Sequence, residues 1–476
     1  MPADTPNILF IMTDQWNESC FSAYNHPDVK TPNIDNFIKN GVAFRRCYCQ
    51  SAICQPSRIS FLSSQYLHTH GVMQNNQEEA RPREHCVSLV GHIRERLGYT
   101  TGAIGKLHLG VWQNKAGFDK IVSACDDVEK KEPDYFAYLR KHDLLGKYER
   151  VSAGAESLFR FHYGESKIPV EHSNENFTAD ETIKFIEESQ GRPFFCWTTF
   201  ERPHSPHYVP YDFHMKYDPE KLVLPDNVSE DFESKPFHKR PGVENSWKSY
   251  VLGEKELRQG MACYYGLMSL IDFNIGRIID YLRQNGLLDN TIIIFSADHG
   301  DFAGNYGMLG KNTPSVDVLY RVPYIWYWGN KFAKDRVYGL TESIDLLPTL
   351  CEILNLPIPP EAQGEEHTDA LFTKDLYEGK EAVFFENVMV KCVRTQEYKL
   401  SFTYDRKAKG ELYDMVNDPW EASNLFNSPQ HSHIQKELME RLLGWYIRTE
   451  LPETVCPLSE RIPRDWRWHQ HIRKVK

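Results

Sequence analysis

One short stretch of this sequence combines residue types that together can act on an anion. Cys54 is followed two residues later by Pro56 and four residues later by Arg58. Proline is favoured in the first turn of a helix, where no backbone N–H partner is needed, and apolar residues then recur at helical spacing: Ile59, Leu62 and Tyr66. A helix N-terminus carries free N–H groups and partial positive charge. The stretch predicts either an anion site at Cys54 or, as the plainer alternative, an inert buried thiol before an amphipathic helix.

The elements that must position this stretch follow from hydrophobic periodicity. Short apolar runs typical of strands buried on both faces cover residues 7–12, 42–48, 99–104, 194–200 and 291–297. Helices are expected at residues 31–39, 88–97, 176–189 and 254–284. This alternation predicts a mostly parallel sheet covered by helices on both faces.

The length of 476 residues and a change of pattern after residue 370 indicate two parts. We predict a large catalytic α/β domain in residues 1–370. Alternating strands and a helix near residues 433–448 predict a smaller C-terminal part in residues 371–476.

Several predicted strands end in side chains suited to a functional site. The strand ends are marked by Asp14, by Lys106, by His204 and by Asp298 with His299. A single residue of this kind is usually an ordinary loop residue, but ligands of open α/β sheets bind beyond the carboxyl ends of the strands. We therefore expect these residues to meet beside Cys54.

Two of these strand ends have the composition of a divalent-metal site. Asp14 and Asp298 offer carboxylates and Gln15 an amide oxygen, ligands that favour Ca²⁺ or Mg²⁺. His299 would add a nitrogen ligand and so also admits Mn²⁺ or Zn²⁺.

Four stretches of the chain resemble type I sulfatases of the alkaline phosphatase superfamily. Residues 54–58 resemble the Cys-x-Pro-Ser-Arg signature, 105–110 the Gly-Lys-x-His-x-Gly segment, 203–206 the Pro-His-x-Pro turn, and 411–419 a C-terminal segment of that family. The resemblance runs from about residue 6 to about residue 426. It does not cover the region 120–167, expected to be an insertion that shapes the pocket, or the tail 451–476.

The resemblance implies an enzyme that hydrolyses sulfate esters of sugars or other small organic molecules. A maturation enzyme would oxidise Cys54 to formylglycine, whose hydrated aldehyde is the nucleophile. The implied fold is an α/β/α sandwich with a smaller C-terminal α+β domain.

The resemblance also implies roles for individual residues. One metal ion, Ca²⁺ first and Mn²⁺ second, would be held by Asp14, Gln15, Cys54, Asp298 and His299. Arg58, Lys106 and Lys311 would bind sulfate oxygens, His108 would help the second hydroxyl lose its proton, and His204 with Lys311 would protonate the leaving group. Asn75 is assigned to substrate binding with Lys106, His204 and Lys311.

Two departures from the common family pattern leave the chemistry partly open. Gln15 and His299 stand where an Asp and an Asn are common, as in choline sulfatases and phosphonate monoester hydrolases. A phosphonate monoester or phosphodiester hydrolase therefore remains the nearer alternative. A non-catalytic protein that binds sulfated glycans, with Cys54 unmodified, is the more distant one.

Composition limits the partners. A net charge of −11 disfavours a nucleic-acid-binding surface, and no apolar run is long enough to predict a transmembrane helix. No basic signal region precedes the first strand, so we expect a cytoplasmic protein, or a periplasmic one if a signal sequence has been removed. Eleven scattered cysteines predict reduced thiols. A homo-oligomer is possible, and the tail 451–476 is either a basic aromatic arm at the pocket or a subunit contact, or a loosely ordered end.

Overall fold

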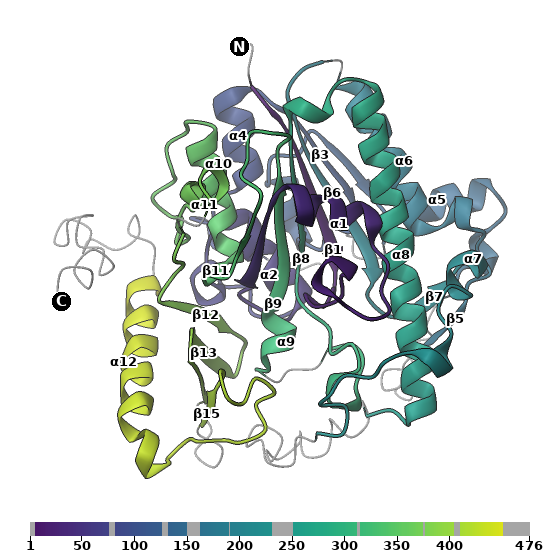
Figure 1. Cartoon of the computed structure of the whole chain (residues 1–476). Helices are drawn as coiled ribbons and strands as arrows, with labels where there is room; N and C mark the ends of the chain where they lie inside the picture. Colours follow the sequence, from purple (N-terminus) through teal and green to yellow (C-terminus); the bar gives the residue numbers. More distant parts are fainter. Residues whose placement is uncertain are drawn as a thin grey trace.

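A nine-stranded sheet forms the centre of the molecule (Figure 1). The computed structural model describes residues 5–75, 81–125, 132–149, 162–189, 191–230, 251–311, 315–374, 377–403 and 410–450. The strand order is β10-β2-β9-β8-β1-β6-β3-β4, with β11 paired to β2. The strands are β1 (Asn7–Asp14), β2 (Val42–Tyr48), β3 (Thr100–Gly105), β4 (Lys120–Ser123), β6 (Phe194–Pro203), β8 (Thr291–Ala297), β9 (Arg321–Tyr327), β10 (Asp335–Val337) and β11 (Thr341–Glu342).

The strand directions confirm the predicted mostly parallel sheet. β1 runs parallel to both β6 and β8, and β3 runs parallel to both β6 and β4. Among the described strands of this sheet, β9 alone is antiparallel to its neighbours, β2 and β8. β1 lies in the middle, and all eight of its residues are buried, as a continuous apolar run predicts.

Helices cover both faces of the sheet and complete the expected α/β/α sandwich (Figure 1). One face carries α1 (Pro32–Asn40), α6 (Asn174–Glu188) and α8 (Glu254–Gln284), and the other carries α2 (Cys54–Ser63), α4 (Leu89–Leu97) and α10 (Leu346–Ile353). The shorter helices are α3 (Leu67–His70), α5 (Asp134–Lys141), α7 (Tyr211–His214), α9 (Asp317–Tyr320) and α11 (Thr368–Phe372).

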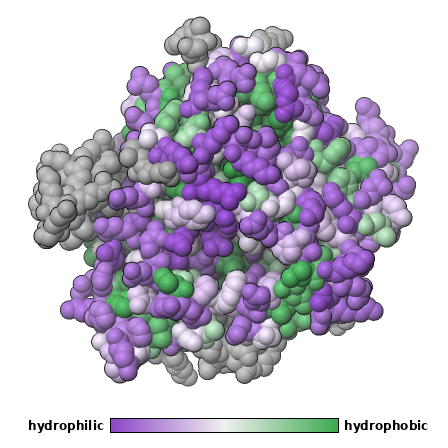
Figure 2. All heavy atoms as spheres, in the orientation of Figure 1, coloured by the Kyte–Doolittle hydropathy of each residue, from purple (hydrophilic) through white to green (hydrophobic). Residues whose placement is uncertain are grey.

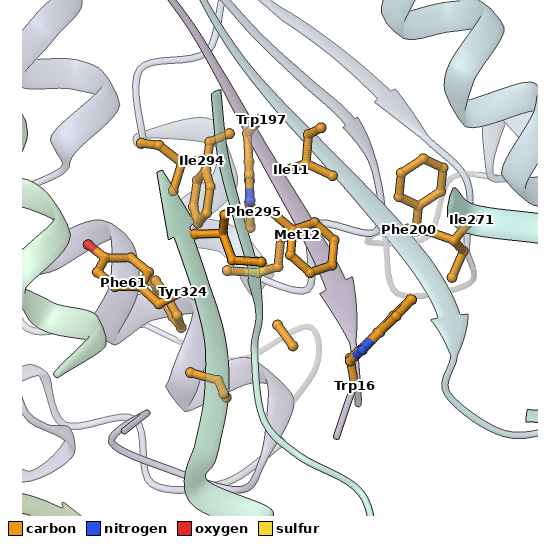
Figure 3. Close-up of a cluster of buried hydrophobic side chains, with 14 of the residues drawn as sticks. Ile11, Met12, Trp16, Phe61, Trp197, Phe200, Ile271, Ile294, Phe295 and Tyr324 are labelled. Carbon is orange, nitrogen blue, oxygen red and sulfur yellow. The ribbon is translucent and has the colours of Figure 1, made fainter. Parts of the chain in front are cut away.

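Aromatic side chains from distant parts of the chain fill the core between sheet and helices (Figure 3). Phe10 of β1 contacts Phe61 of α2 and Trp197 of β6, with ring centroids 6.0 and 6.5 Å apart. Trp16, just beyond β1, packs edge-on against Phe295 of β8 at 5.7 Å. These contacts pack α2 and β6 against β1, and they pack the end of β1 against β8.

Asp272 has a structural role. Its carboxylate, on α8, accepts hydrogen bonds from the backbone N–H groups of Asn33 (3.1 Å) and Ile34 (2.8 Å). These groups belong to the first turn of α1, where intrahelical partners are missing. Asp272 therefore fixes α1 to α8 and caps it.

The C-terminal part contains the strands and the helix predicted for it, and its strands form a second, antiparallel sheet. It consists of β12 (Ala382–Glu386), β13 (Val390–Thr395), β14 (Tyr398–Thr403) and β15 (Gly410–Asp414), covered by α12 (Ser432–Thr449). Trp445 of α12 stacks on Phe384 of β12, with centroids 4.9 Å apart. The change from one sheet to the other falls between Glu342 and Ala382, on either side of the proposed boundary at residue 370.

The region 120–167 differs from the expected insertion in one respect. Its first residues form β4, which extends the central sheet in parallel with β3. A short run of four residues lacks enough periodicity to be recognised as a strand. α5 and β5 (Tyr163–Glu165) follow, and β5 pairs with β7 (His207–Val209). Residues 126–131, residues 150–161 and the tail 451–476 lie outside the described residues, so the roles predicted for the insertion and the tail stay predictions.

The character of the surface and the state of the cysteines agree with what the composition of the sequence indicates. Hydrophilic residues predominate on the face seen in Figure 2, and apolar side chains there form scattered groups. Within the described residues, no helix combines the length and apolar character needed to cross a membrane. The ten cysteines of the described residues are free thiols, as predicted.

Candidate active site

The predicted site residues meet at the carboxyl edge of the central sheet. Asp14 is the last residue of β1, and Lys106 and Asp298 come directly after β3 and β8. Backbone hydrogen bonds from Asp298 to Thr13 (3.1 Å) and from Lys106 to Thr199 (2.9 Å) hold these ends in register. Cys54 is the first residue of α2, one position later in the helix than expected.

Four side chains form a buried cluster with the composition of a cation site. Asp14, Cys54, Asp298 and His299 each offer a ligand atom, and these atoms all lie within 4.8 Å of one another. Nε2 of His299 is 3.4 Å from Oδ1 of Asp14 and 3.5 Å from Oδ1 of Asp298. Two carboxylates and one imidazole suit a divalent ion such as Ca²⁺ or Mn²⁺, so the residues fit the predicted metal.

The orientation of His299 is fixed by its other ring nitrogen. Nδ1 donates to the carbonyl oxygen of Gly300 (2.9 Å). This bond leaves Nε2 to face the carboxylates, which is the usual arrangement of a metal-binding histidine.

Gln15, the predicted amide ligand, is also at this edge. Its backbone N–H donates to Oδ1 of Asp298 (3.1 Å), while its side-chain Nε2 donates to Oδ2 of Asp301 (2.6 Å). The amide nitrogen is therefore occupied by Asp301, and the amide oxygen is the end left to act as a ligand.

Arg58 has a different position from the one expected for a sulfate-binding cation. Its guanidinium is fully buried and contacts Oδ2 of Asp298 at 2.7 Å and Oδ2 of Asp14 at 3.4 Å. It also donates to the carbonyl of Lys106 (2.6 Å) and the hydroxyl of Thr199 (2.8 Å). Because these bonds occupy the guanidinium, Arg58 acts by positioning the two carboxylates.

The two predicted lysines lie against the buried cluster. Nζ of Lys106 is 2.8 Å from Oδ2 of Asp14, and Nζ of Lys311 is 2.7 Å from Sγ of Cys54. Burial raises the pKa of the Cys54 thiol, but the charges of Lys311, Lys106 and His299 together lower that pKa well below its usual value. The site therefore favours negative charge at position 54.

The surrounding charges act on Asp14 in the same direction. Burial and the neighbouring Cys54 raise the pKa of its carboxyl, but Lys106, His204 and Lys311 outweigh them and leave the pKa well below its usual range. Asp14 is thus ionised, as a metal ligand must be.

Three further predicted residues surround the cluster. His108, buried and with a left-handed φ of 52°, lies beside Cys54 and helps lower the pKa of its thiol. His204 is half-buried, and its Nδ1 donates to the carbonyl of Ser205 (2.6 Å), which leaves Nε2 for a substrate. Asn75 is exposed, and its Oδ1 accepts the backbone N–H of Gln55 (3.1 Å), so it caps the first turn of α2. Its part in substrate binding stays a prediction.

Sequence reasoning missed three residues that support the site. Ser57 donates to the carbonyl of Asp298 (2.5 Å), Thr199 binds Arg58, and Asp301 binds Gln15. Burial raises the pKa of Asp301 to about 7, although hydrogen bonds from Ala303 and Gln15 oppose this. Asp301 lies three residues after Asp298 in the sequence, and that proximity was the one signal available for it.

Comparison with known protein families gives two matches. The model of the family described as sulfatase matches residues 6–356, and the model described as N-sulphoglucosamine sulphohydrolase, C-terminal, matches residues 304–447. The first match covers most of the chain.

Individual relatives agree with the family match. The chain is 26% identical to an arylsulfatase of Clostridium perfringens, over 92% of this chain and 95% of the relative. It is 28% identical to an ulvan-active sulfatase of Formosa agariphila, over 92% and 80%. Among solved structures, the phosphonate monoester hydrolase of Agrobacterium radiobacter matches with a TM-score of 0.78 and 22% identity, over 93% of this chain and 96% of the other. This last likeness shows the fold.

Proposed function

The chain belongs to the sulfatase family and is a sulfatase, and we propose that it hydrolyses the sulfate ester of a carbohydrate or another small organic molecule, with formylglycine at position 54 as the nucleophile. The overall reaction adds water to the ester and releases an alcohol and hydrogen sulfate. The relative from Formosa agariphila, an ulvan-active sulfatase, supports a carbohydrate substrate.

One observation supports position 54 as the nucleophile above the others. Cys54 begins a helix, is buried, and has Lys311, Lys106, His108 and His299 around its sulfur. An inert core thiol has a pKa that burial raises, as Cys196 does. The environment of Cys54 instead stabilises an anion.

The reaction depends on two groups that this chain would carry. Formylglycine, when hydrated, supplies one hydroxyl to attack sulfur and a second hydroxyl whose deprotonation lets sulfate leave. A divalent ion held by Asp14, Gln15, Asp298, His299 and residue 54 would offset charge on the sulfate and lower the pKa of the attacking hydroxyl. We propose calcium first, because most of the ligands are hard oxygens, and manganese second.

The side chains divide the remaining tasks. Lys106 and Lys311 bind sulfate oxygens through charge-assisted hydrogen bonds, which are worth about 1.5–3 kcal/mol each. His204 presents Nε2 to the leaving oxygen and gives it a proton, since Nδ1 is already bound to Ser205. His108 accepts the proton of the second hydroxyl, because it lies beside residue 54.

A phosphonate monoester or phosphodiester hydrolase that uses the same site is the second candidate. The observation that favours it is the presence of Gln15 and His299 in the metal site, where the common sulfatase pattern has Asp and Asn. A tetrahedral phosphonate would meet the same lysines and the same nucleophile.

A substrate panel tests the proposal. Protein co-expressed with a formylglycine-generating maturation enzyme is assayed on sulfated mono- and disaccharides, and on an aryl sulfate, an aryl phosphonate and an aryl phosphodiester with one common leaving group. We expect the largest kcat/KM on a sulfate ester, with Cys54→Ala as the inactive control. A larger kcat/KM on the phosphonate would instead select the second candidate. No turnover of any ester by aldehyde-containing protein would contradict both.

A further inference from the structure

The residues around Gln15 distinguish between the two ends of its side-chain amide, the oxygen and the NH₂ group. The backbone of Gln15 has a left-handed φ of 69°, a conformation that L residues disfavour. Two contacts hold it there: its N–H donates to Asp298 (3.1 Å), and its carbonyl accepts the hydroxyl of Tyr264 (2.8 Å). The direction of the side chain is therefore set before any ligand arrives.

A carboxamide has two ends of nearly equal shape and opposite hydrogen-bonding character. Its oxygen can bind a cation, whereas its NH₂ group cannot. Asp301 is fully buried, and its Oδ2 accepts from Nε2 of Gln15 at 2.6 Å. Its Oδ1 accepts from the backbone N–H of Ala303 at 2.6 Å. Both carboxyl oxygens of Asp301 therefore accept from N–H groups, and the oxygen nearer to Gln15 pairs with the NH₂ end of its amide.

The loop that carries Asp301 is itself held firmly. The carbonyl of Asp301 accepts from Nδ2 of Asn17 (2.7 Å), and the N–H of Asn17 donates to the hydroxyl of Tyr264 (3.0 Å). The backbone N–H of Phe302 donates to the carbonyl of Gly310 (3.0 Å), the residue before Lys311. The carboxyl group of Asp301 thus has a fixed place between the end of β1 and the loop that carries Lys311.

We propose that Asp301 is a positioning residue for the metal site, because its carboxylate holds the Gln15 amide with Oε1 turned toward the ion. This inference rests on the proposed metal site and on Gln15 as one of its ligands. Asp301 is not itself a ligand in this proposal, because its two carboxyl oxygens accept from Gln15 and Ala303.

The test exchanges donor and acceptor between the two side chains. In Asp301→Asn, the new amide keeps its oxygen on the Ala303 N–H and turns its NH₂ group to Gln15. Gln15 must then reverse and present NH₂ to the ion. In the double variant Asp301→Asn with Gln15→Glu, one oxygen of the new carboxylate at position 15 accepts from the new amide at position 301. The other carboxylate oxygen stays available as a ligand.

Binding of Mn²⁺ alone is the readout, measured by electron paramagnetic resonance of the free ion on full-length, chelator-treated protein above neutral pH. We expect Asp301→Asn to weaken Mn²⁺ binding by about tenfold to a hundredfold, the usual range for a residue behind a metal ligand. The double variant should bind within a few-fold of wild type. Asp272→Asn, which loses another buried carboxylate, the one on α8 that caps α1, should bind as wild type does.

The outcomes separate the two proposals. Wild-type Mn²⁺ affinity in Asp301→Asn would overturn the role of Asp301 and leave the metal site standing. A double variant that binds no better than a correctly folded Asp301→Asn would also overturn it. If Asp301→Asn does not fold, the double variant is compared with Gln15→Leu, and equal binding by those two contradicts the proposal. Wild-type protein that binds no Mn²⁺ would overturn the metal site and this inference together.

Discussion

Arg58 and Asp298 form a fully buried ion pair, with Nε 2.7 Å from Oδ2. The same guanidinium reaches Asp14, so one cation from α2 joins the ends of β1 and β8. Breaking a buried pair leaves an uncompensated charge, which costs about 3–5 kcal/mol. We therefore predict that Arg58→Ala lowers the free energy of unfolding by this amount, measured by urea denaturation in the presence of chelator.

A surface pair provides the control. Arg94 and Asp119 are also 2.7 Å apart, but both side chains are substantially exposed. Arg94→Ala should cost less than about 1 kcal/mol. If the two variants lose similar stability, Arg58 does not have the role assigned to it.

Lys106 and Lys311 should act mainly on the transition state. Loss of one preorganised donor to a developing oxyanion typically lowers kcat by about 10²-fold or more. We expect this loss in Lys106→Ala and in Lys311→Ala, with a smaller change in KM. Steady-state kinetics on one sulfate ester measures both. An increase in KM with unchanged kcat would place the lysine in uniform substrate binding instead.

The contribution of His204 to kcat/KM should grow with the basicity of the leaving group. The leaving group of an aryl sulfate is a stable phenolate. The leaving group of a sugar sulfate is a strongly basic alkoxide, which needs a proton in the transition state. His204→Ala should therefore reduce kcat/KM for sugar sulfates much more than for activated aryl sulfates. Equal losses on both would falsify the assignment and leave His204 as a residue that only orders the 203–206 turn.

Asp272 should give stability a pH dependence away from the active site. Burial raises the pKa of its carboxyl from 3.8 to about 6, so the folded state holds this proton more tightly than the unfolded chain. Its contribution to the free energy of unfolding then falls as pH rises from about 4 to about 6. Chemical denaturation across this window should show that decline in wild type and a flatter profile in Asp272→Asn. Parallel profiles would contradict the shift.

The sequence predicted most of what positions the site. The five apolar runs became β1, β2, β3, β6 and β8, and α8 spans the residues predicted for it, Glu254–Gln284. Long amphipathic helices and buried parallel strands leave a strong periodic pattern. β4 was not predicted, because a strand of four residues at the edge of a sheet leaves almost no periodic pattern in the sequence.

The contacts inside the site were less accessible to sequence reasoning. Arg58 turns inward to Asp298, and Asp301 binds Gln15, in both cases across more than 200 residues of sequence. Residue type and spacing indicate that a side chain is near the site. They do not say whether it faces the substrate or holds another side chain, since that depends on tertiary packing.

The central claim is that residue 54 acts only after its oxidation to formylglycine. Protein is prepared with increasing amounts of the maturation enzyme, and the fraction of aldehyde at position 54 is measured by peptide mass spectrometry beside kcat on a sulfate ester. Activity should rise in proportion to the aldehyde fraction and extrapolate to zero without it, and Cys54→Ala should stay inactive. Full turnover by protein that carries only the Cys54 thiol, or by Cys54→Ala, would contradict the account.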